Sequence, residues 1–194
     1  MFLETICIIN GKVQNIDAHE RRMKETALYY GFIAPKLPDI ENLLNEGIKE
    51  CKVKCRICYH NHINSIKFEK YVPRKIDSLK LVNASPDYTY KFSDRTVLDD
   101  LMKFRNGCDE VLIVRNGLIT DTTYTNVVFS RNDQFFTPHH PLLNGTKRQK
   151  LLHEGKINEV QIDIDSLGNY DRVWLINALL DIEDNVSLPV ENIY

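Results

Sequence analysis

The order in which strand-like and helix-like segments follow one another constrains the fold of this chain more than any other feature. Short apolar or alternating segments and segments of helical periodicity are mixed, without a regular strand–helix–strand repeat. This order indicates an α+β fold. The stretch at residues 83–89 is polar and rich in turn formers, so we predict a domain boundary there. The expected domains are a small α+β domain at residues 1–84 and a second domain at 85–194.

The first domain is predicted to combine a sheet with helices. Its expected elements are a strand at 2–10, helices at 17–30 and 39–50, and strands at 51–60, 65–72 and 78–83. Asn10 and Gly11 give a turn signal after the first strand. Asp17 is predicted to cap the first helix, and Gly31 is predicted to end it.

The second domain is predicted to begin with a helix and to continue mainly in strands. Its expected elements are a helix at 93–107, hairpins at 109–120 and 126–138, a helix at 145–154, and closing strands at 160–164 and 172–180. Ser93 or Asp94 is the expected cap of the first of these helices, and Gly107 is its expected end.

Three cysteines in the stretch 51–60, CKVKCRICYH, have a C-x3-C-x2-C spacing that can ligate an iron–sulfur cluster. The same stretch alternates apolar and polar residues with period two, as a half-buried strand does. In such a strand Cys51 and Cys55 lie on the apolar face and Cys58 lies on the opposite face. Thiolates on opposite faces of a sheet cannot converge on one cluster. We therefore interpret these cysteines as small core residues.

Charge and hydropathy argue against several classes of function. The 194-residue chain has a net charge of −2 and no cluster of lysine and arginine, so we expect no nucleic-acid partner. No apolar run approaches the roughly 20 residues that span a bilayer, so we expect no membrane partner. The first ten residues are too short for a signal peptide and contain an acid. Together with an odd number of cysteines, five, this favours a reducing, cytoplasmic location.

Single residues give only weak signals. Lys91 before a helix is by itself most simply a solvated lysine, and Asp121 at a strand end is most simply a turn former. The stretch NGTKR at 144–148 leads a glycine turn into a helix, whose first amides could hold a phosphate. His139 and His140 resemble metal ligands. A two-histidine loop without a third ligand is better read as a surface turn, so no metal is expected.

Four segments are more informative together. HERRM at 19–23 is similar to a family pattern H-L-x-R-L, and KFSDR at 91–95 resembles a segment that begins with a cofactor-binding lysine. GLITDTTYTNVVF at 117–129 matches G-x-[IV]-T-E-x4-N-[IVL]-F closely. TP and LLNGTKR, within 137–148, match T-P followed by L-L-x-G-x-x-R. In order and spacing over residues 19–152, the chain resembles the class IV aminotransferases, the fold-type-IV pyridoxal-phosphate enzymes.

The resemblance implies a fold, a cofactor and a domain role. The fold would be that of enzymes like D-amino-acid aminotransferase, with an N-terminal sheet and helices and a C-terminal barrel-like β domain with helices. The cofactor would be pyridoxal 5'-phosphate. The domain at 85–194 would bind the cofactor and carry the lysine, and a homodimer would be expected.

The resemblance also implies a role for each matching residue. Lys91 would be the catalytic residue, bound covalently to the cofactor and later moving protons at the substrate carbon. Asp121, where the family usually has Glu, would keep the pyridine nitrogen protonated. Arg22 would bind the phosphate as a bidentate fork. The remaining residues expected at the phosphate end of the cofactor pocket are Thr125, Asn126, Gly145 and Thr146, and Arg148 would shape the site or cap the turn.

Arg95 is the residue that favours one reaction over the others. The segment from Lys91 to Arg95 is closer to the K-x-x-N-R of 4-amino-4-deoxychorismate lyases than to the K-x-x-N-Y of branched-chain transaminases. The expected activity is therefore a lyase that releases pyruvate and forms 4-aminobenzoate from a small amino substrate. The alternatives are a branched-chain or D-amino-acid transaminase, a degenerate cofactor-binding protein without turnover, and a purely structural α+β domain.

Overall fold

The computed structural model describes all 194 residues, and the chain forms two compact units. Unit 1 contains Met1–Val72 and Tyr90–Asp94, and unit 2 contains Pro73–Thr89 and Arg95–Tyr194. These bounds differ from a single division between residues 84 and 85 in two ways. Unit 2 already begins at Pro73, so the strand predicted at 78–83 belongs to unit 2, and the chain returns to unit 1 for the five residues 90–94. Lys91 lies in that returning segment.

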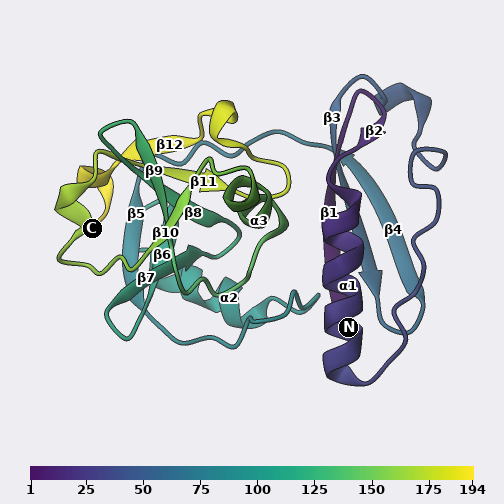
Figure 1. Cartoon of the computed structure of the whole chain (residues 1–194), viewed down its shortest axis with the longest axis horizontal. Helices are drawn as coiled ribbons and strands as arrows, with labels where there is room; N and C mark the ends of the chain where they lie inside the picture. The colour runs from purple at the N-terminus through teal and green to yellow at the C-terminus, as the bar shows by residue number, and fades with distance from the viewer. The chain divides into compact units, whose positions relative to one another are not determined.

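Unit 1 is a four-stranded antiparallel sheet with one long helix beside it (Figure 1). The sheet order is β2-β1-β3-β4. The strands are β1 (Phe2–Ile9), β2 (Lys12–Val13), β3 (Lys52–Tyr59) and β4 (Ile63–Lys70), and the helix is α1 (Ile16–Tyr30). The predicted strands at 2–10, 51–60 and 65–72 and the predicted helix at 17–30 are confirmed, with small differences at their ends.

The strand β3 shows the alternation that its sequence predicts. Val53, Cys55, Ile57 and Tyr59 are buried, and the residues between them are only half-buried. The buried side packs in a core that includes Ile6 and Met23 from other elements of unit 1. Cys55 is therefore a small core residue, as expected. Cys58 lies among the outward-facing positions of the strand, where it cannot join Cys55 in one cluster.

The ends of α1 follow glycine and asparagine chemistry. Gly31 adopts φ 72° at the C-terminus and donates its backbone N–H to Ala27 O, which confirms it as the helix end. The predicted cap Asp17 is wrong. The N-cap is Asn15 in a left-handed conformation, and Asp17 lies in the first turn, where a negative charge suits the helix dipole.

The helix predicted at 39–50 is also wrong. Only Glu46–Ile48 forms a short 3-10 helix, named η1. The apolar residues Leu37, Ile40 and Leu44 are buried in the unit 1 core from an irregular segment rather than from one helical face. The Asn45 side chain accepts from Gly47 N, and this local bond competes with helix propagation.

Unit 2 is built on a curled sheet that forms a half-barrel (Figure 1). The strand order is β10-β9-β8-β7-β6-β5, and β11 pairs with both β8 and β12. The strands are β5 (Leu79–Asn83), β6 (Glu110–Arg115), β7 (Leu118–Thr122), β8 (Asn126–Arg131), β9 (Gln134–Pro138), β10 (Asn158–Val160), β11 (Arg172–Ile176) and β12 (Ser187–Pro189). Both predicted hairpins are confirmed, the first at its Asn116–Gly117 turn.

The helices of unit 2 are short. They are α2 (Thr96–Leu101), which continues as the 3-10 helix η2 (Met102–Phe104), and α3 (Thr146–His153); 3-10 turns η3 (Leu167–Asn169), η4 (Ile182–Asp184) and η5 (Val190–Asn192) follow. The predicted cap at Ser93 or Asp94 is wrong, since Arg95 is the N-cap of α2. The predicted strand at 160–164 is also misplaced, because β10 ends at Val160 and only an isolated bridge at Asp163 follows.

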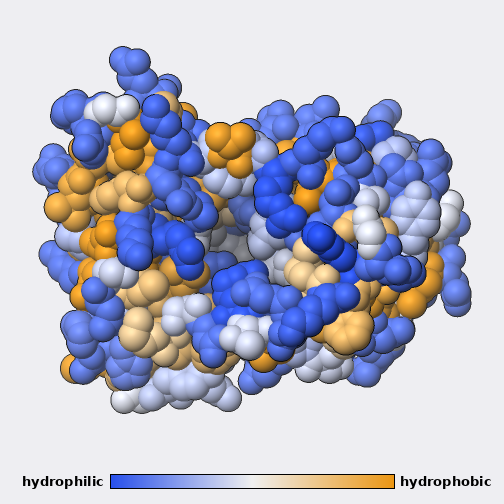
Figure 2. Space-filling view, turned by 180° about the vertical axis from the view of Figure 1, so that it is seen from behind, coloured by the Kyte–Doolittle hydropathy of each residue, from blue (hydrophilic) through white to orange (hydrophobic).

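The surface carries both polar and apolar side chains. Hydrophilic and hydrophobic residues are intermixed on the face that Figure 2 shows. None of the helices has both the length and the apolar character that a membrane span requires. The most exposed large apolar side chains in unit 1 include Leu28 and Ile33, each 85% exposed.

Candidate functional site

Asp121 is a buried carboxylate on β7 that is held by three hydrogen bonds. Its Oδ2 accepts from the backbone N–H groups of Leu142, at 2.8 Å, and Leu143, at 3.0 Å. Its Oδ1 accepts from Asn126 Nδ2 at 2.8 Å. A carboxylate has about four acceptor positions, so Oδ1 retains capacity for a further donor. The local sequence places this group well, because β7 and β8 pair at Asp121 and Asn126 across the strands.

The environment of Asp121 makes its ionised form less favourable than it is in water. Burial raises the pKa of Asp121 from 3.8 to about 6, although the hydrogen bonds from Leu143, Asn126 and Leu142 act in the opposite direction. Arg148 lowers the pKa further, but by the smallest of these effects. A carboxylate that is fully buried without a directly paired cation is suited to receive a positively charged donor.

Asn126 and Gly145 pack so closely that only glycine fits at 145. Gly145 has an ordinary extended backbone, with φ −66° and ψ 144°, so its conformation does not require glycine. A methyl group at this position would instead overlap Asn126 Oδ1. The Asn126 amide donates to both Asp121 and Leu143 O, at 2.8 Å each. The predicted residues Asp121, Asn126 and Gly145 are therefore in one contiguous cluster.

Arg148 stabilises the loop that holds Asp121. Its Nη2 donates to Pro138 O at 2.8 Å and its Nη1 donates to Asn144 Oδ1 at 3.2 Å, so its guanidinium joins the two ends of the loop 138–144. Nη2 also pairs with Glu159 at 2.5 Å. The side chain is nearly fully buried. The two roles considered for Arg148 were to shape the site or to cap the turn, and these contacts support the first.

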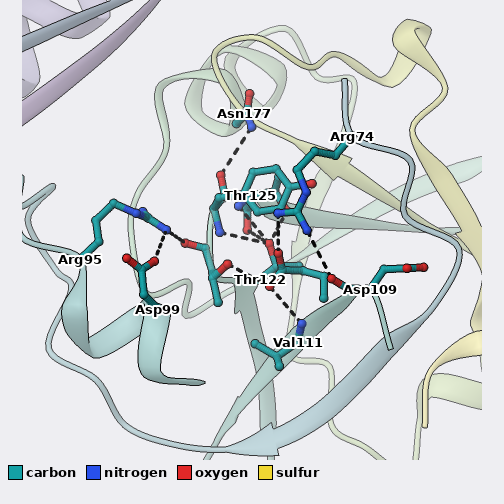
Figure 3. A network of polar contacts seen from close by, with 11 residues as sticks. Arg74, Arg95, Asp99, Asp109, Val111, Thr122, Thr125 and Asn177 are labelled. Atoms are coloured by element: carbon teal, nitrogen blue, oxygen red, sulfur yellow. Dashed lines mark hydrogen bonds and ion pairs between the residues drawn. The ribbon is translucent and has the colours of Figure 1, made fainter. Parts of the chain in front are cut away.

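The turn at residues 122–125 follows Asp121 directly and is closed by threonine hydroxyls. Thr122 Oγ1 lies 2.7 Å from Thr125 Oγ1 and accepts from Thr125 N at 3.0 Å (Figure 3). Both threonines are buried. Thr125 therefore belongs to the support of the turn in unit 2, with its hydroxyl engaged by Thr122.

Side chains from three directions hold this turn in place. Arg95, at the start of α2, donates to Thr123 O at 2.9 Å, and Asn177 donates to Tyr124 O at 3.4 Å (Figure 3). The buried carboxylate of Glu110 accepts from Thr123 Oγ1 at 2.9 Å. Sequence reasoning missed the roles of Glu110 and Asn177, because neither belongs to a recognised motif.

Thr146 is the first residue of α3 and is buried. The first turn of a helix presents backbone N–H groups and the positive end of the helix dipole. α3 starts directly after Gly145, so this helix end lies next to the Asn126 amide. A phosphate or another anion is the ligand that such a helix end suits.

Lys91 is placed by the first strand of unit 1. Its backbone carbonyl accepts from Leu3 N at 2.9 Å, and the next residue, Phe92, forms a β-bridge with Phe2. Ser93 N donates to Met1 O at 3.1 Å. The segment with Lys91 is thus tied to the N-terminal end of β1, and the Leu3–Lys91 bond lies one residue from Glu4.

Arg22 is buried and paired, and it is not on a solvated helix face. Its Nε donates to Glu4 Oε1 at 2.9 Å, and its Nη2 donates to Glu4 Oε2 at 2.5 Å. His19, one helical turn earlier on α1, has Nδ1 2.6 Å from Glu4 Oε2. Glu4 itself has no exposed surface. Sequence reasoning missed Glu4; the signal was a lone acid within the apolar strand FLETICII.

Electrostatics make Glu4 charged and His19 neutral. Burial acts to raise the pKa of Glu4, but the charge of Arg22 and the hydrogen bonds from His19 and Arg22 outweigh burial and lower the pKa to about 2. Burial lowers the pKa of His19, and the hydrogen bond to Glu4 only partly opposes this. The charges of Arg22 and Lys91 also lower the pKa of His19, so the Lys91 ammonium acts on the same cluster.

Each unit, taken by itself, offers groups of a kind that pyridoxal phosphate requires. Asp121 offers a buried carboxylate with acceptor capacity, and the α3 terminus beside Gly145 offers backbone donors. Unit 1 offers an amine, Lys91, and a guanidinium, Arg22, whose charge suits a phosphate. Outside these groups, His139 lies 3.6 Å from Glu159, and no group of three or more possible metal ligands is found.

Comparison with known proteins gives the family to which this α+β chain belongs. The family described as "Amino-transferase class IV" matches residues 1–184. The chain therefore belongs to the class IV aminotransferase family. The predicted α+β fold with a separate N-terminal sheet is confirmed by the likeness to a solved structure from Haemophilus somnus.

Three relatives document the likeness. An uncharacterized protein of Haemophilus influenzae is 36% identical over 180 residues, which are 91% of this chain and 96% of the relative. A crystal structure from Haemophilus somnus, described as a "putative 4-amino-4-deoxychorismate lyase", has a TM-score of 0.82 at 34% identity and covers 92% of this chain and 95% of its own. A pyridoxal-phosphate-bound hypothetical aminotransferase from Mycobacterium tuberculosis shares the fold, with a TM-score of 0.75 at 17% identity, covering 92% and 77% of the two chains.

Proposed function

We propose that this protein is a pyridoxal-phosphate-dependent lyase that converts 4-amino-4-deoxychorismate into 4-aminobenzoate and pyruvate. The observation that carries the proposal is the likeness, along almost the whole length of both chains, to the Haemophilus somnus protein. The cluster around Asp121 supports the cofactor part of the proposal, because a buried carboxylate with spare acceptor capacity suits a protonated ring nitrogen.

Each residue has a proposed role. Lys91 binds the cofactor covalently and then moves the proton that the substrate carbon loses. When bound, the cofactor supplies an electron-withdrawing ring, and Asp121 keeps its nitrogen protonated. Arg22 is a proposed ligand of the phosphate, and the backbone N–H of Thr146 is another. Thr125, Asn126 and Gly145 complete the pocket by fixing Asp121 and the start of α3.

The reaction balances without a second substrate. The substrate loses a proton from its ring, and the bond between the ring and the enolpyruvyl oxygen breaks. Pyruvate leaves as its enol, and the ring becomes aromatic. Aromatisation drives the reaction, so the protein mainly has to orient the substrate and provide a proton relay at Lys91.

Arg95 is not the basis of this proposal. Its guanidinium donates to Thr123 O at 2.9 Å and lies 3.6 Å from Asp99. These contacts give Arg95 a structural role at the turn after Asp121. The preference for a lyase over a transaminase therefore depends on the relatives.

The reaction class is tested by an assay for pyruvate release. The purified protein with added pyridoxal phosphate and 4-amino-4-deoxychorismate is expected to release pyruvate at the same rate with and without a 2-oxo acid. A rate that depends on the 2-oxo acid, measured with branched-chain or D-amino acids, would replace the lyase by a transaminase. No turnover of either kind would indicate a degenerate cofactor-binding protein.

We also propose a cytoplasmic homodimer. All five cysteines are free thiols, and this suits a reducing compartment. The homodimer follows from the family resemblance, and the proposed ligand is a small amino substrate. Sedimentation at several protein concentrations measures the oligomeric state directly.

A further inference from the structure

Glu4 is a carboxylate in a place where a charge is costly. It lies in the middle of β1, opposite Ile57 of β3, and has 0% exposed surface. A carboxylate is removed from water only where charged hydrogen-bond partners compensate for its lost hydration. Its presence on a strand whose other residues, apart from Thr5, are apolar therefore calls for a reason beyond packing.

Three hydrogen bonds converge on Glu4, and two of them fix one guanidinium. Arg22 Nε and Nη2 meet the two carboxylate oxygens at 2.9 and 2.5 Å in a fork-to-fork pair. His19 Nδ1 meets Oε2 at 2.6 Å. Because His19 is neutral, it donates this bond from Nδ1–H, and Glu4 thereby sets its tautomer.

The fork determines where the rest of Arg22 points. An arginine side chain has several rotatable bonds, and a planar pair with a buried carboxylate removes most of that freedom. With Nε and Nη2 directed at Glu4, the direction of Nη1 is also set, because the guanidinium is rigid and planar. A ligand that binds Arg22 would then not have to order the side chain.

The charge of Glu4 disfavours binding of an anion at Arg22, whereas the orientation that Glu4 gives to the Arg22 guanidinium favours it. The carboxylate offsets the positive charge of Arg22 and would repel a phosphate at short range. If Glu4 served only to neutralise a buried arginine, its removal would strengthen phosphate binding. If Glu4 served to orient Arg22, its removal would weaken phosphate binding. The sign of the change separates the two roles.

We propose that Glu4 is a positioning residue, which holds the Arg22 guanidinium ready for the cofactor phosphate. This proposal rests on the proposed function, since Arg22 is the phosphate ligand there. Glu4 acts on the phosphate only through Arg22, and it has no role at the ring or at Lys91. The effect of removing Glu4 should therefore depend on the ligand having a phosphate group.

The test compares pyridoxal phosphate with pyridoxal, which lacks the phosphate, in the full-length protein. Glu4→Gln is expected to weaken binding of pyridoxal phosphate about tenfold or more and to change binding of pyridoxal by less than about twofold. The rise in melting temperature that inorganic phosphate gives to the cofactor-free protein should shrink in parallel. Equal or tighter binding of pyridoxal phosphate, or equal losses for both ligands, would overturn the proposal.

Controls separate positioning from loss of charge or of folding. Glu41→Gln removes one negative charge from the exposed pair with Lys12 in the same unit and should leave both affinities unchanged. In an Arg22→Met background, Glu4→Gln should have no further effect on the affinity ratio. If Glu4→Gln does not fold, Glu4→Asp is the substitute, because it keeps the charge but withdraws it by one methylene. It should lower the ratio of the affinity for pyridoxal phosphate to the affinity for pyridoxal.

Failure of this inference can be told apart from failure of the proposed function. A wild-type protein that binds neither pyridoxal phosphate nor pyridoxal contradicts the function itself. A wild-type protein that binds both, with a Glu4→Gln variant that retains its preference for the phosphorylated ligand, contradicts only the role of Glu4.

Discussion

Asp121→Asn is expected to lower turnover about a hundredfold or more and, at the same time, to make the stability of the cofactor-free protein less dependent on pH between 4 and 8. Turnover falls because an amide cannot keep a ring nitrogen protonated. The pH dependence falls because the wild-type protein must hold an ionised carboxylate in a buried position at high pH, whereas an amide stays neutral. The amide also places a donor where Asp121 accepts, which costs stability at every pH. Since the pKa of Asp121 is about 6 instead of 3.8, its ionisation costs up to about 3 kcal/mol.

The sign of the pH dependence follows from proton uptake. Between the ordinary pKa and the raised pKa of Asp121, the folded protein binds more protons than the unfolded chain. This contribution to the free energy of unfolding is therefore present below about pH 4 and is lost as the pH rises through about 6. Chemical unfolding from pH 4 to pH 8 should show the loss as a difference between wild type and Asp121→Asn.

Asp109→Asn is the matched control in unit 2. Asp109 also accepts three hydrogen bonds, but those from Asp77 N and Ser78 lower its pKa. Its removal should thus destabilise the protein at neutral pH and leave turnover intact. An Asp121→Asn variant whose stability changes with pH as the wild type's does, or that retains wild-type turnover, would contradict the account of Asp121.

Gly145→Ala is the second change with a large expected effect. The added methyl group would overlap Asn126 Oδ1, so Asn126 or the start of α3 must move. The expected loss in the free energy of unfolding is about 1–3 kcal/mol, as for other overpacked sites. Pyridoxal-phosphate affinity should fall as well, since Asn126 holds Asp121 and α3 offers the phosphate donors.

Gly168→Ala is the control for the glycine itself. No neighbouring atom would lie within 4 Å of an alanine Cβ at position 168, so alanine fits there. The substitution should leave the free energy of unfolding unchanged or raise it by up to about 1 kcal/mol. Asn126→Ala removes the overlapped group, so in that background the extra cost of Gly145→Ala should nearly vanish. Equal effects of Gly145→Ala and Gly168→Ala on stability and cofactor binding would rule out the steric account.

Patterns with a strict local cause were predictable from the sequence. Apolar and polar residues alternate along β3, so only one face of this strand can be buried. The turn at Asn116–Gly117 requires residues that tolerate positive φ. The segment at 39–50 was not predictable in this way. Its buried residues Ile40 and Leu44 fit a helical spacing, but a local Asn45 side-chain bond and tertiary packing in unit 1 decide its irregular path.

The candidate site was predictable to the extent that its motifs are local. Asp121 and Asn126 lie five residues apart, and their contact follows from the tight turn between β7 and β8. The contact between Glu4 and Arg22 joins a strand to a helix, so the lone acid in the strand does not reveal its partner. Likewise, the two amides that hold Asp121 come from a loop more than twenty residues further on. Such contacts depend on tertiary structure that periodicity does not specify.

The central claim is that this chain binds pyridoxal phosphate covalently through Lys91. The most direct measurement is the visible absorbance of wild type and Lys91→Ala with added pyridoxal phosphate, followed by borohydride reduction and mass analysis of the peptide that contains residue 91. The account predicts a visible band in wild type, a reduced adduct on Lys91, and neither in Lys91→Ala. Absence of the band from wild type at saturating cofactor, or an equal band and adduct in both proteins, would contradict it.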